Sequence, residues 1–219
     1  MKTLPFFLAF VLWTALPLHA DLTITQDVEQ TGGPKPGKMA LTIMIKGHMV
    51  RMDLNPQVSA LHDLSTGDTT TLVHPQKMAM KIPADMMKKM KAARDEKRGE
   101  AAALVDTGNK DTINGFACEE YDTSVQGMKV QMWVTKDAPD AQKVMTELKS
   151  LSDDLDPLGG ALSKQDIPGF PVRTVITMPD NVSITTTVVK LNTDTLPDSD
   201  FTIPDGYKPV DAPAQMMGQ

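Results

Sequence analysis

The stretch MALTIMIKGHMVRMDLNP, residues 39–56, decides the fold. In its first half every second residue is apolar: Met39, Leu41, Ile43 and Ile45. The alternation returns after the turn residues Gly47 and His48, with three apolar residues on one side: Val50, Met52 and Leu54. A period of two predicts β-strands that bury one face. Two such segments joined by a short turn predict an antiparallel pair.

Segments of the same character continue on both sides of this pair. We expect strands over residues 22–28, 39–46, 50–54, 58–64, 69–74, 78–82, 113–123, 129–135, 172–178 and 182–191. Turn signals separate them, such as Ser65-Thr66-Gly67-Asp68 and Pro179-Asp180-Asn181. Short strands at regular spacing indicate antiparallel hairpins rather than βαβ units.

Two helices are expected between the strands. The first covers residues 84–98 after Pro83, with apolar residues at helical spacing: Met86, Met87, Met90 and Ala93. The second follows Pro139 and covers residues 141–151. This order of elements predicts one α+β domain, a large antiparallel sheet with its helices gathered on one face.

The first twenty residues have the pattern of an export signal. Lys2 precedes an apolar stretch, Pro17 ends that stretch, and Ala20 supplies the small residue of a cleavage site. A membrane span needs about 20 apolar residues, which is more than this stretch offers. We therefore expect residues 1–20 to be removed after Ala20. The mature protein is expected to work in a bacterial periplasm, as a single domain over residues 21–210 with a loose tail at 211–219.

Charge and cysteine content exclude several classes of protein. The chain has 22 basic and 28 acidic residues, a net charge of -6, and the basic residues form no stripe or tail, which argues against nucleic acid as a partner. Cys118 is the only cysteine, so no internal disulfide can form. We expect Cys118 to be a buried, unreactive apolar residue.

No pattern of catalytic residues is recognisable. The mature chain has three histidines, His48, His62 and His74, and none lies in a hydrolase, metalloprotease or nucleotide-binding motif. The adjacent acids Glu119 and Glu120 point to opposite faces of a strand, and we interpret them as a solvated strand edge. The sequence therefore predicts no enzyme and no cofactor.

Methionine is the unusual feature of the composition, with 16 residues. Three interpretations compete. Thioether and imidazole groups suit Cu(I), and His48, Met49 and Met52 offer such groups, although a strand points Met49 and Met52 to opposite faces. Alternatively, methionine forms an apolar surface that adapts to variable partners. The third interpretation is an ordinary core. The adaptable surface is favoured for the methionines of the first helix, whose other residues are mostly basic.

Several motifs together resemble a known group. These are GHMVRMDL, HDLSTGDTTTLVHPQKMAMKIP, INGFACEEY, MKVQMWVTKD and FTIPDGYKPV, which lie between residues 38 and 208. The sequence resembles an uncharacterised family of exported bacterial domains, which is similar to the LolA-like superfamily of lipoprotein carriers. The resemblance implies a curved antiparallel half-barrel, with helices packed on the concave face and an apolar cavity for acyl chains. Those carriers usually begin with a helix, whereas here Asp21 leads directly into a strand.

The leading hypothesis is a periplasmic binding or carrier protein for a lipid, a lipoprotein acyl chain or another apolar small molecule. The residues expected to line its cavity are Leu41, Ile43, Ile45, Val50, Met52, Met80, Ile82, Met86, Met87 and Met90. One alternative is an envelope module for protein interaction or stress sensing, with the same fold and a filled core. The other alternative is a copper-binding protein that uses methionine and histidine.

Overall fold

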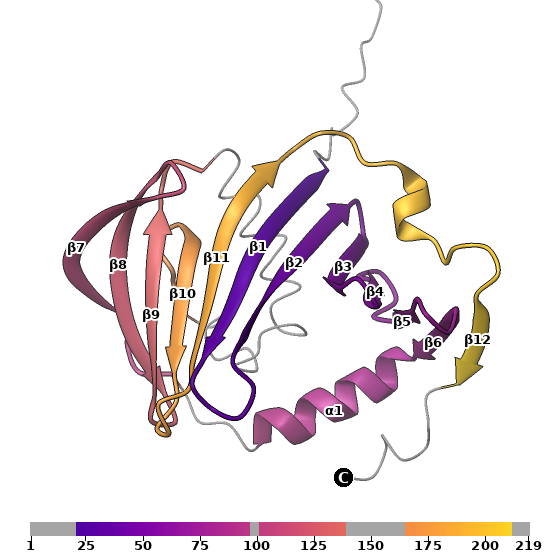
Figure 1. Ribbon diagram of the computed structural model, residues 1–219, viewed down its shortest axis with the longest axis horizontal. Helices are drawn as coiled ribbons and strands as arrows, with labels where there is room; N and C mark the ends of the chain where they lie inside the picture. The colour runs from indigo at the N-terminus through magenta and orange to yellow at the C-terminus, as the bar shows by residue number, and fades with distance from the viewer. Residues whose placement is uncertain (1–20, 97–100, 139–164, 212–219) are drawn as a thin grey trace, which may run out of the picture.

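The computed structural model describes residues 21–96, 101–138 and 165–211 (Figure 1). Three sequence predictions lie outside the described residues. They are the export signal at residues 1–20, the second helix at residues 141–151, and all of the tail at residues 211–219 except its first residue.

Twelve strands form one continuous sheet, in the order β12-β6-β5-β4-β3-β2-β1-β11-β10-β9-β8-β7. The first six are β1 (Leu22–Thr31), β2 (Gly37–Lys46), β3 (Met49–Asn55), β4 (Val58–Asp63), β5 (Thr69–Val73) and β6 (Met78–Ile82). The others are β7 (Val105–Ile113), β8 (Phe116–Val125), β9 (Met128–Thr135), β10 (Phe170–Thr177), β11 (Ser183–Asn192) and β12 (Lys208–Asp211). All neighbours are antiparallel except β12 and β6. The sheet is open and strongly curved (Figure 1).

The predicted strands are confirmed, with one correction and two additions. The segment predicted as one strand over residues 113–123 contains a turn, because Asn114 and Gly115 have φ of 50° and 86° and separate β7 from β8. Such a turn matches the twist of a hairpin. Sequence analysis missed β7, which carries polar residues on both faces and is almost wholly exposed. It also missed β12, a short edge strand that contains Pro209.

One face of the sheet, here called the apolar face, follows the predicted alternation. Ile45 of β2 lies opposite Leu22 of β1 and Val50 of β3, and all three are buried. They belong to the largest core cluster, which also contains residues of the other half of the sheet: Ile113, Cys118, Phe170, Val172 and Val188. The curvature therefore brings strands from both ends of the chain into one core.

The opposite face of β3 to β6 is covered by residues 193–211, here called the strap, which follows β11 and ends in β12 (Figure 1). Within it the 3₁₀ helix η1 (Asp198–Phe201) buries Phe201. Arg51 of β3 donates from Nη1 to the carbonyl oxygen of Asp200 at 3.0 Å. Tyr207 packs against the third core cluster, formed by Leu61, Leu72 and Ala79.

A chain of hydrogen bonds joins the strap to the sheet. Ser59 gives its only hydroxyl hydrogen to Oδ1 of Asp53 at 2.6 Å, so Nε2 of His74, 2.8 Å from Ser59 Oγ, must be the donor of that pair. The other ring nitrogen of His74 then accepts from the hydroxyl of Tyr207. Arg51 Nε closes the chain by donating to Asp53 Oδ1 at 2.8 Å. The Ser59 hydroxyl, both ring nitrogens of His74 and the Tyr207 hydroxyl therefore each have a partner.

The first predicted helix is confirmed as α1 (Ala84–Glu96), and the last two residues of the prediction, 97 and 98, lie outside the described residues. It begins after Pro83, and Oδ1 of Asp68 accepts the Ala84 N–H at 3.0 Å, which supplies a cap for the helix start. Lys81, 2.7 Å from the same carboxylate, and then the Ala84 N–H hold the pKa of Asp68 below its usual value. In Figure 1, α1 extends from β6 along the open side of the curved sheet towards the turn between β1 and β2.

Gly169, which immediately precedes β10, provides a test of the close packing between the start of β10 and the end of β9. Its φ is +153°, and a Cβ there would lie 2.4 Å from the carbonyl oxygen of Thr135. We expect Gly169→Ala to lower the free energy of unfolding by more than about 2 kcal/mol in urea denaturation. Gly47→Ala is the matched control, because Gly47 also has a positive φ but no atom lies near its Cβ position. Its expected loss is about 1 kcal/mol. Equal losses would contradict this packing.

Candidate functional site

The seven strand residues predicted to line a cavity share the apolar face. Cross-strand pairing aligns Ile43 with Met52 and, through Ala60 and Thr71, with Met80. The adjacent row aligns Ile45 with Val50 and, through His62 and Thr69, with Ile82. Leu41 lies two residues before Ile43 on β2 and so points the same way.

These residues lie at different depths. Ile45 and Val50 are 2% and 0% exposed and form part of the packed core. Ile43 and Met52 are half-buried at the margin of that core. Leu41 and Met80 are also half-buried, but they belong to none of the core clusters that the described residues form. The apolar face is therefore packed at one end and partly open at the other.

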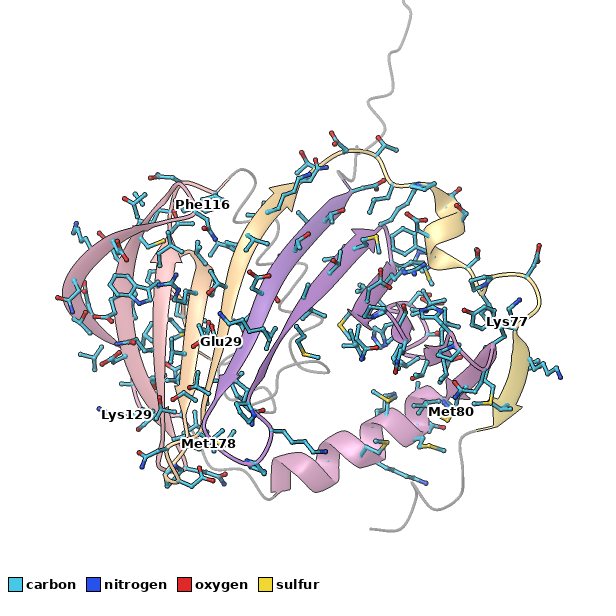
Figure 2. The ribbon with its side chains drawn as sticks, viewed as in Figure 1. Glu29, Lys77, Met80, Phe116, Lys129 and Met178 are labelled. Carbon is cyan, nitrogen blue, oxygen red and sulfur yellow. The ribbon has the colours of Figure 1, made fainter. Side chains whose placement is uncertain are left out.

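Helix α1, which follows β6, carries the other three residues predicted to line the cavity. Met86 and Met87 are half-buried, and Met90 is 44% exposed. Figure 2 shows Met80, on the strand that leads into α1, close to the first turn of the helix. None of the three helix methionines belongs to a core cluster of the described residues.

Sequence analysis missed one polar residue on the apolar face. His62 of β4 lies between Val50 and Thr69 in the register and is 4% exposed. Its Nδ1 is 2.8 Å from Oγ1 of Thr69. The sequence signal for this placement is the alternation of β4, because His62 lies two residues after Ala60 and residues two apart on a strand share a face.

The pairing of Ser59 with His74 does not form a nucleophile. Ser59 is 1% exposed, and its hydroxyl hydrogen is directed to Asp53 rather than to the imidazole. An activated serine instead gives its proton to the histidine. The family-like motifs around Arg51, His74 and Tyr207 therefore serve the attachment of the strap.

The residues considered for copper do not converge on β3. Met49 pairs with Asp63, and Met52 pairs with Ala60, so the two thioethers lie on opposite faces. His48 is exposed, and its Nε2 is 3.9 Å from Oδ1 of Asp63. Within residues 21–96, 101–138 and 165–211, no group of three or more His, Cys, Asp or Glu side chains is placed to hold a metal ion.

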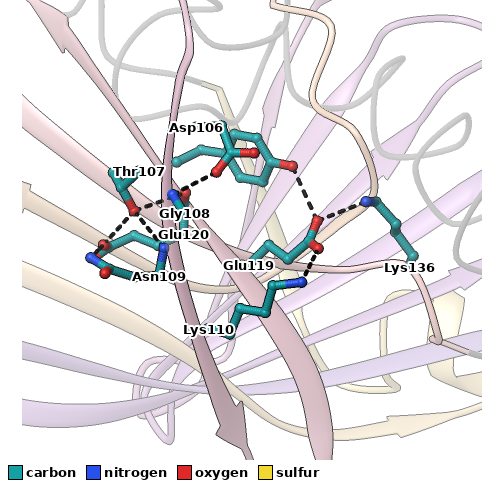
Figure 3. Close-up of polar contacts among 9 residues, drawn as sticks. Asp106, Thr107, Gly108, Asn109, Lys110, Glu119, Glu120 and Lys136 are labelled. Atoms are coloured by element: carbon teal, nitrogen blue, oxygen red, sulfur yellow. Dashed lines mark hydrogen bonds and ion pairs between the residues drawn. The ribbon is translucent and has the colours of Figure 1, made fainter.

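Glu119 and Glu120 lie on opposite faces as predicted, but their interpretation as a solvated edge is wrong for Glu120, which is 4% exposed (Figure 3). A bulge in β7 at residues 107–109 brings Thr107 and Asn109 over its carboxylate, and both donate to Oε2. Two neutral donors thus replace the water that this carboxylate loses on folding.

Glu119 instead forms two ion pairs. Lys136 is 2.7 Å from Oε2 and Lys110 is 3.1 Å from Oε1 (Figure 3). The hydrogen bonds from Lys136 and then Lys110 lower the pKa of Glu119 to about 2. Tyr121 also donates to this carboxylate at 3.3 Å. The cluster links β7, β8 and the end of β9.

Comparisons with known proteins were made for the whole chain. A family described as a domain of unknown function, DUF4412, matches residues 29–207. The predicted relation to an uncharacterised domain family is thereby confirmed. No curated protein matches the chain significantly. No helix among the described residues is long and apolar enough to cross a membrane.

Three solved structures are similar to the chain. PNGF-II has a TM-score of 0.43 at 12% identity, covering 88% of this chain and 32% of its own length, so this chain spans about a third of that protein. A LolA superfamily protein from Nitrosomonas europaea has a TM-score of 0.35 at 9% identity, covering 83% and 90%. A DUF1329 family protein from Desulfovibrio piger has a TM-score of 0.33 at 9% identity, covering 84% and 90%. All three TM-scores lie below 0.5, so ligand and function are taken from none of these proteins.

Cys118 is buried as predicted, with 2% exposure, and burial raises the pKa of its thiol. Since the thiolate is the reactive form, we expect the native protein to react with an aromatic disulfide reagent far more slowly than the urea-unfolded protein. Cys118→Ser should fold and leave ligand binding unchanged. Labelling of the native protein as fast as that of the unfolded protein would contradict this expectation.

The ion pairs of Glu119 with Lys110 and Lys136 should make the stability of the protein depend on pH. The folded-state pKa of about 2 lies below the ordinary glutamate pKa of 4.5, so the stabilisation is complete above pH 4.5 and is lost as the pH falls towards 2. Glu119→Gln should therefore lower stability at pH 7, and its difference from the wild type should vanish near pH 2. Denaturant titrations across this range measure the difference. A difference that does not change with pH would show that the ion pairs are not its cause.

Proposed function

The chain belongs to the DUF4412 family, and from that premise we propose that it is a periplasmic binding or carrier protein for a lipid, a lipoprotein acyl chain or a similar apolar ligand. It performs no catalysis in this proposal. The resemblance of its motifs to the LolA-like superfamily implies the same class of ligand. The export signal expected at residues 1–20 would bring it to the compartment in which such ligands are carried.

One observation supports the proposal best. Leu41, Met80 and the methionines of α1 are apolar, partly exposed and outside the core clusters of the described residues. The strap covers the other face of β3 to β6, so it does not shield these side chains from water. Apolar surface left partly in water at the open end of a curved sheet gains free energy when a ligand covers it.

The energetics permit binding without a charged contact. Each buried CH₂ group of a ligand contributes about 0.8 kcal/mol, so an acyl chain of several carbons is held by apolar contact alone. Ile45 and Val50 form the packed end of the face and would define how far such a chain can enter. Methionine side chains repack more readily than β-branched ones, which suits acyl chains of different lengths.

Helix α1 would act as the movable cover of this site on the concave side of the half-barrel. At its start, Oδ1 of Asp68 accepts the Ala84 N–H, and the carbonyl oxygen of Pro83 accepts from the N–H groups of Met86 and Met87. In Figure 1 the remainder of the helix extends away from β6. A displacement of the helix about this start would open the site without disturbing the strands.

The methionines of α1 provide the test. Replacing Met86, Met87 and Met90 with Ala should weaken binding in a fluorescent fatty-acid displacement assay, because the variant loses the adaptable apolar cover. Thermal stability should fall by less than the approximately 2–5 kcal/mol of a single large-to-small change in a packed core.

Met44→Ala is the control, since Met44 is half-buried on β2 but points to the opposite face, beside Arg51. It should leave fatty-acid binding unchanged. If the triple variant unfolds like a core variant, or if Met44→Ala weakens binding equally, α1 does not cover a ligand site.

A further inference from the structure

Helix α1 is weakly covered by the part of the chain that the structure describes. Among its described side chains none is buried: Met86 and Met87 are half-buried, and Lys88, Lys89 and Met90 are exposed. The helix has 13 residues. A helix shorter than about 15 residues is marginal in water on its own, because most helical stability in proteins comes from packing one face against another surface. A surface that covers α1 would therefore stabilise it.

The composition of α1 defines the chemistry of such a surface. From residue 86 to residue 94 the helix reads MMKKMKAAR, in which every residue is apolar or basic. Its acids lie at the two ends, Asp85 in the first turn and Asp95 with Glu96 in the last. Among the described residues, neither Lys88 nor Lys89 forms an ion pair. Both ammonium groups are therefore available to an anionic partner.

This positive charge is local. The whole chain carries a net charge of -6, so an extended anionic surface is repelled by most of the protein. The lysine that precedes the helix, Lys81, is already 2.7 Å from the carboxylate of Asp68. The middle of α1 is the part of the helix that attracts such a surface, and this difference fixes the orientation in which the protein approaches it.

A lipid surface matches both kinds of side chain in α1. Anionic head groups pair with lysines, and the glycerol and acyl region beneath them receives apolar side chains, which suits the 44% exposed Met90. Long lysine side chains keep their charge at the head groups while a neighbouring apolar side chain enters more deeply. An acidic polypeptide would pair with the lysines but would offer no apolar layer to Met90.

We propose that α1 docks on an anionic lipid surface, with Lys88 and Lys89 at the phosphate groups and Met90 among the lipid chains. The inference deepens the proposed function and rests on it for the ligand that is exchanged at that surface. Since α1 follows the strand that carries Met80, docking brings the proposed cover of the apolar site to the membrane that supplies or receives the ligand. The docking itself requires no bound ligand.

The test is flotation of the mature protein with lipid vesicles, without added fatty acid. The protein should float with vesicles of equal parts phosphatidylglycerol and phosphatidylcholine but not with phosphatidylcholine alone, and binding should weaken as salt is added. One lysine near an anionic surface contributes about a factor of five in affinity. Replacing Lys88 and Lys89 together with Gln should therefore weaken binding about twentyfold, while fatty-acid displacement by the same variant stays unchanged.

The matched control replaces Lys129 and Lys190 with Gln. Both are exposed, and they lie on β9 and β11 (Figure 2 labels Lys129, far from α1). This variant loses the same charge and should float as the wild type does. Glutamine is a good helix former and all four positions are exposed, so both variants should keep the wild-type melting curve.

Four results would overturn the docking of α1. They are no flotation with phosphatidylglycerol, equal flotation with phosphatidylcholine alone, equal losses in the two double variants, or equally tight binding of soluble polyglutamate, which would make an acidic polypeptide the partner. The two proposals fail separately. Fatty-acid displacement without flotation would refute docking alone, and flotation without fatty-acid displacement would support docking and refute the proposed ligand.

Discussion

The hydrogen-bond chain from Arg51 through Asp53, Ser59 and His74 to Tyr207 is the interaction on which the rest of the structure depends. Ser59 is buried and the other members are partly buried, and each satisfies the next, so loss of one leaves another unpaired. Through it the strap is held against β3 to β6, and β12 is brought into parallel pairing with β6. The chain thus fixes one face and one edge of the sheet together.

Because the strap covers one face of β3 to β6, the side chains of the apolar face must either pack in a core or remain exposed to solvent. At one end of the apolar face, Ile45 and Val50 belong to the same buried core cluster as Cys118 and Phe170 from the other half of the sheet, and the core is closed. At the other end, Leu41 and Met80 belong to none of the core clusters that the described residues form, and α1 follows the strand that carries Met80. The difference between the two ends is what makes the apolar face a candidate site rather than an ordinary core.

Sequence reasoning was strongest where one face of a strand is buried. The alternation of β2 and β3 placed Leu41, Ile43 and Met52 correctly on one face, because burial imposes the period of two. It failed at β7, whose residues are exposed on both faces and leave no such signal. It also failed for Glu120, because its donors come from a bulge that no local pattern announces. The roles of His74 and Tyr207 depend on a contact across 133 residues, which no window of sequence contains.

The proposed function requires that the open end of the apolar face holds an apolar ligand. Native mass spectrometry of the mature protein, purified from the periplasm of an expression host without detergent, tests it most directly. We expect a population heavier than the bare chain by the mass of one fatty acid or lipid, which is lost on gentle activation. A folded protein that shows only the mass of the bare chain, even after incubation with fatty acids and phospholipids, would contradict it.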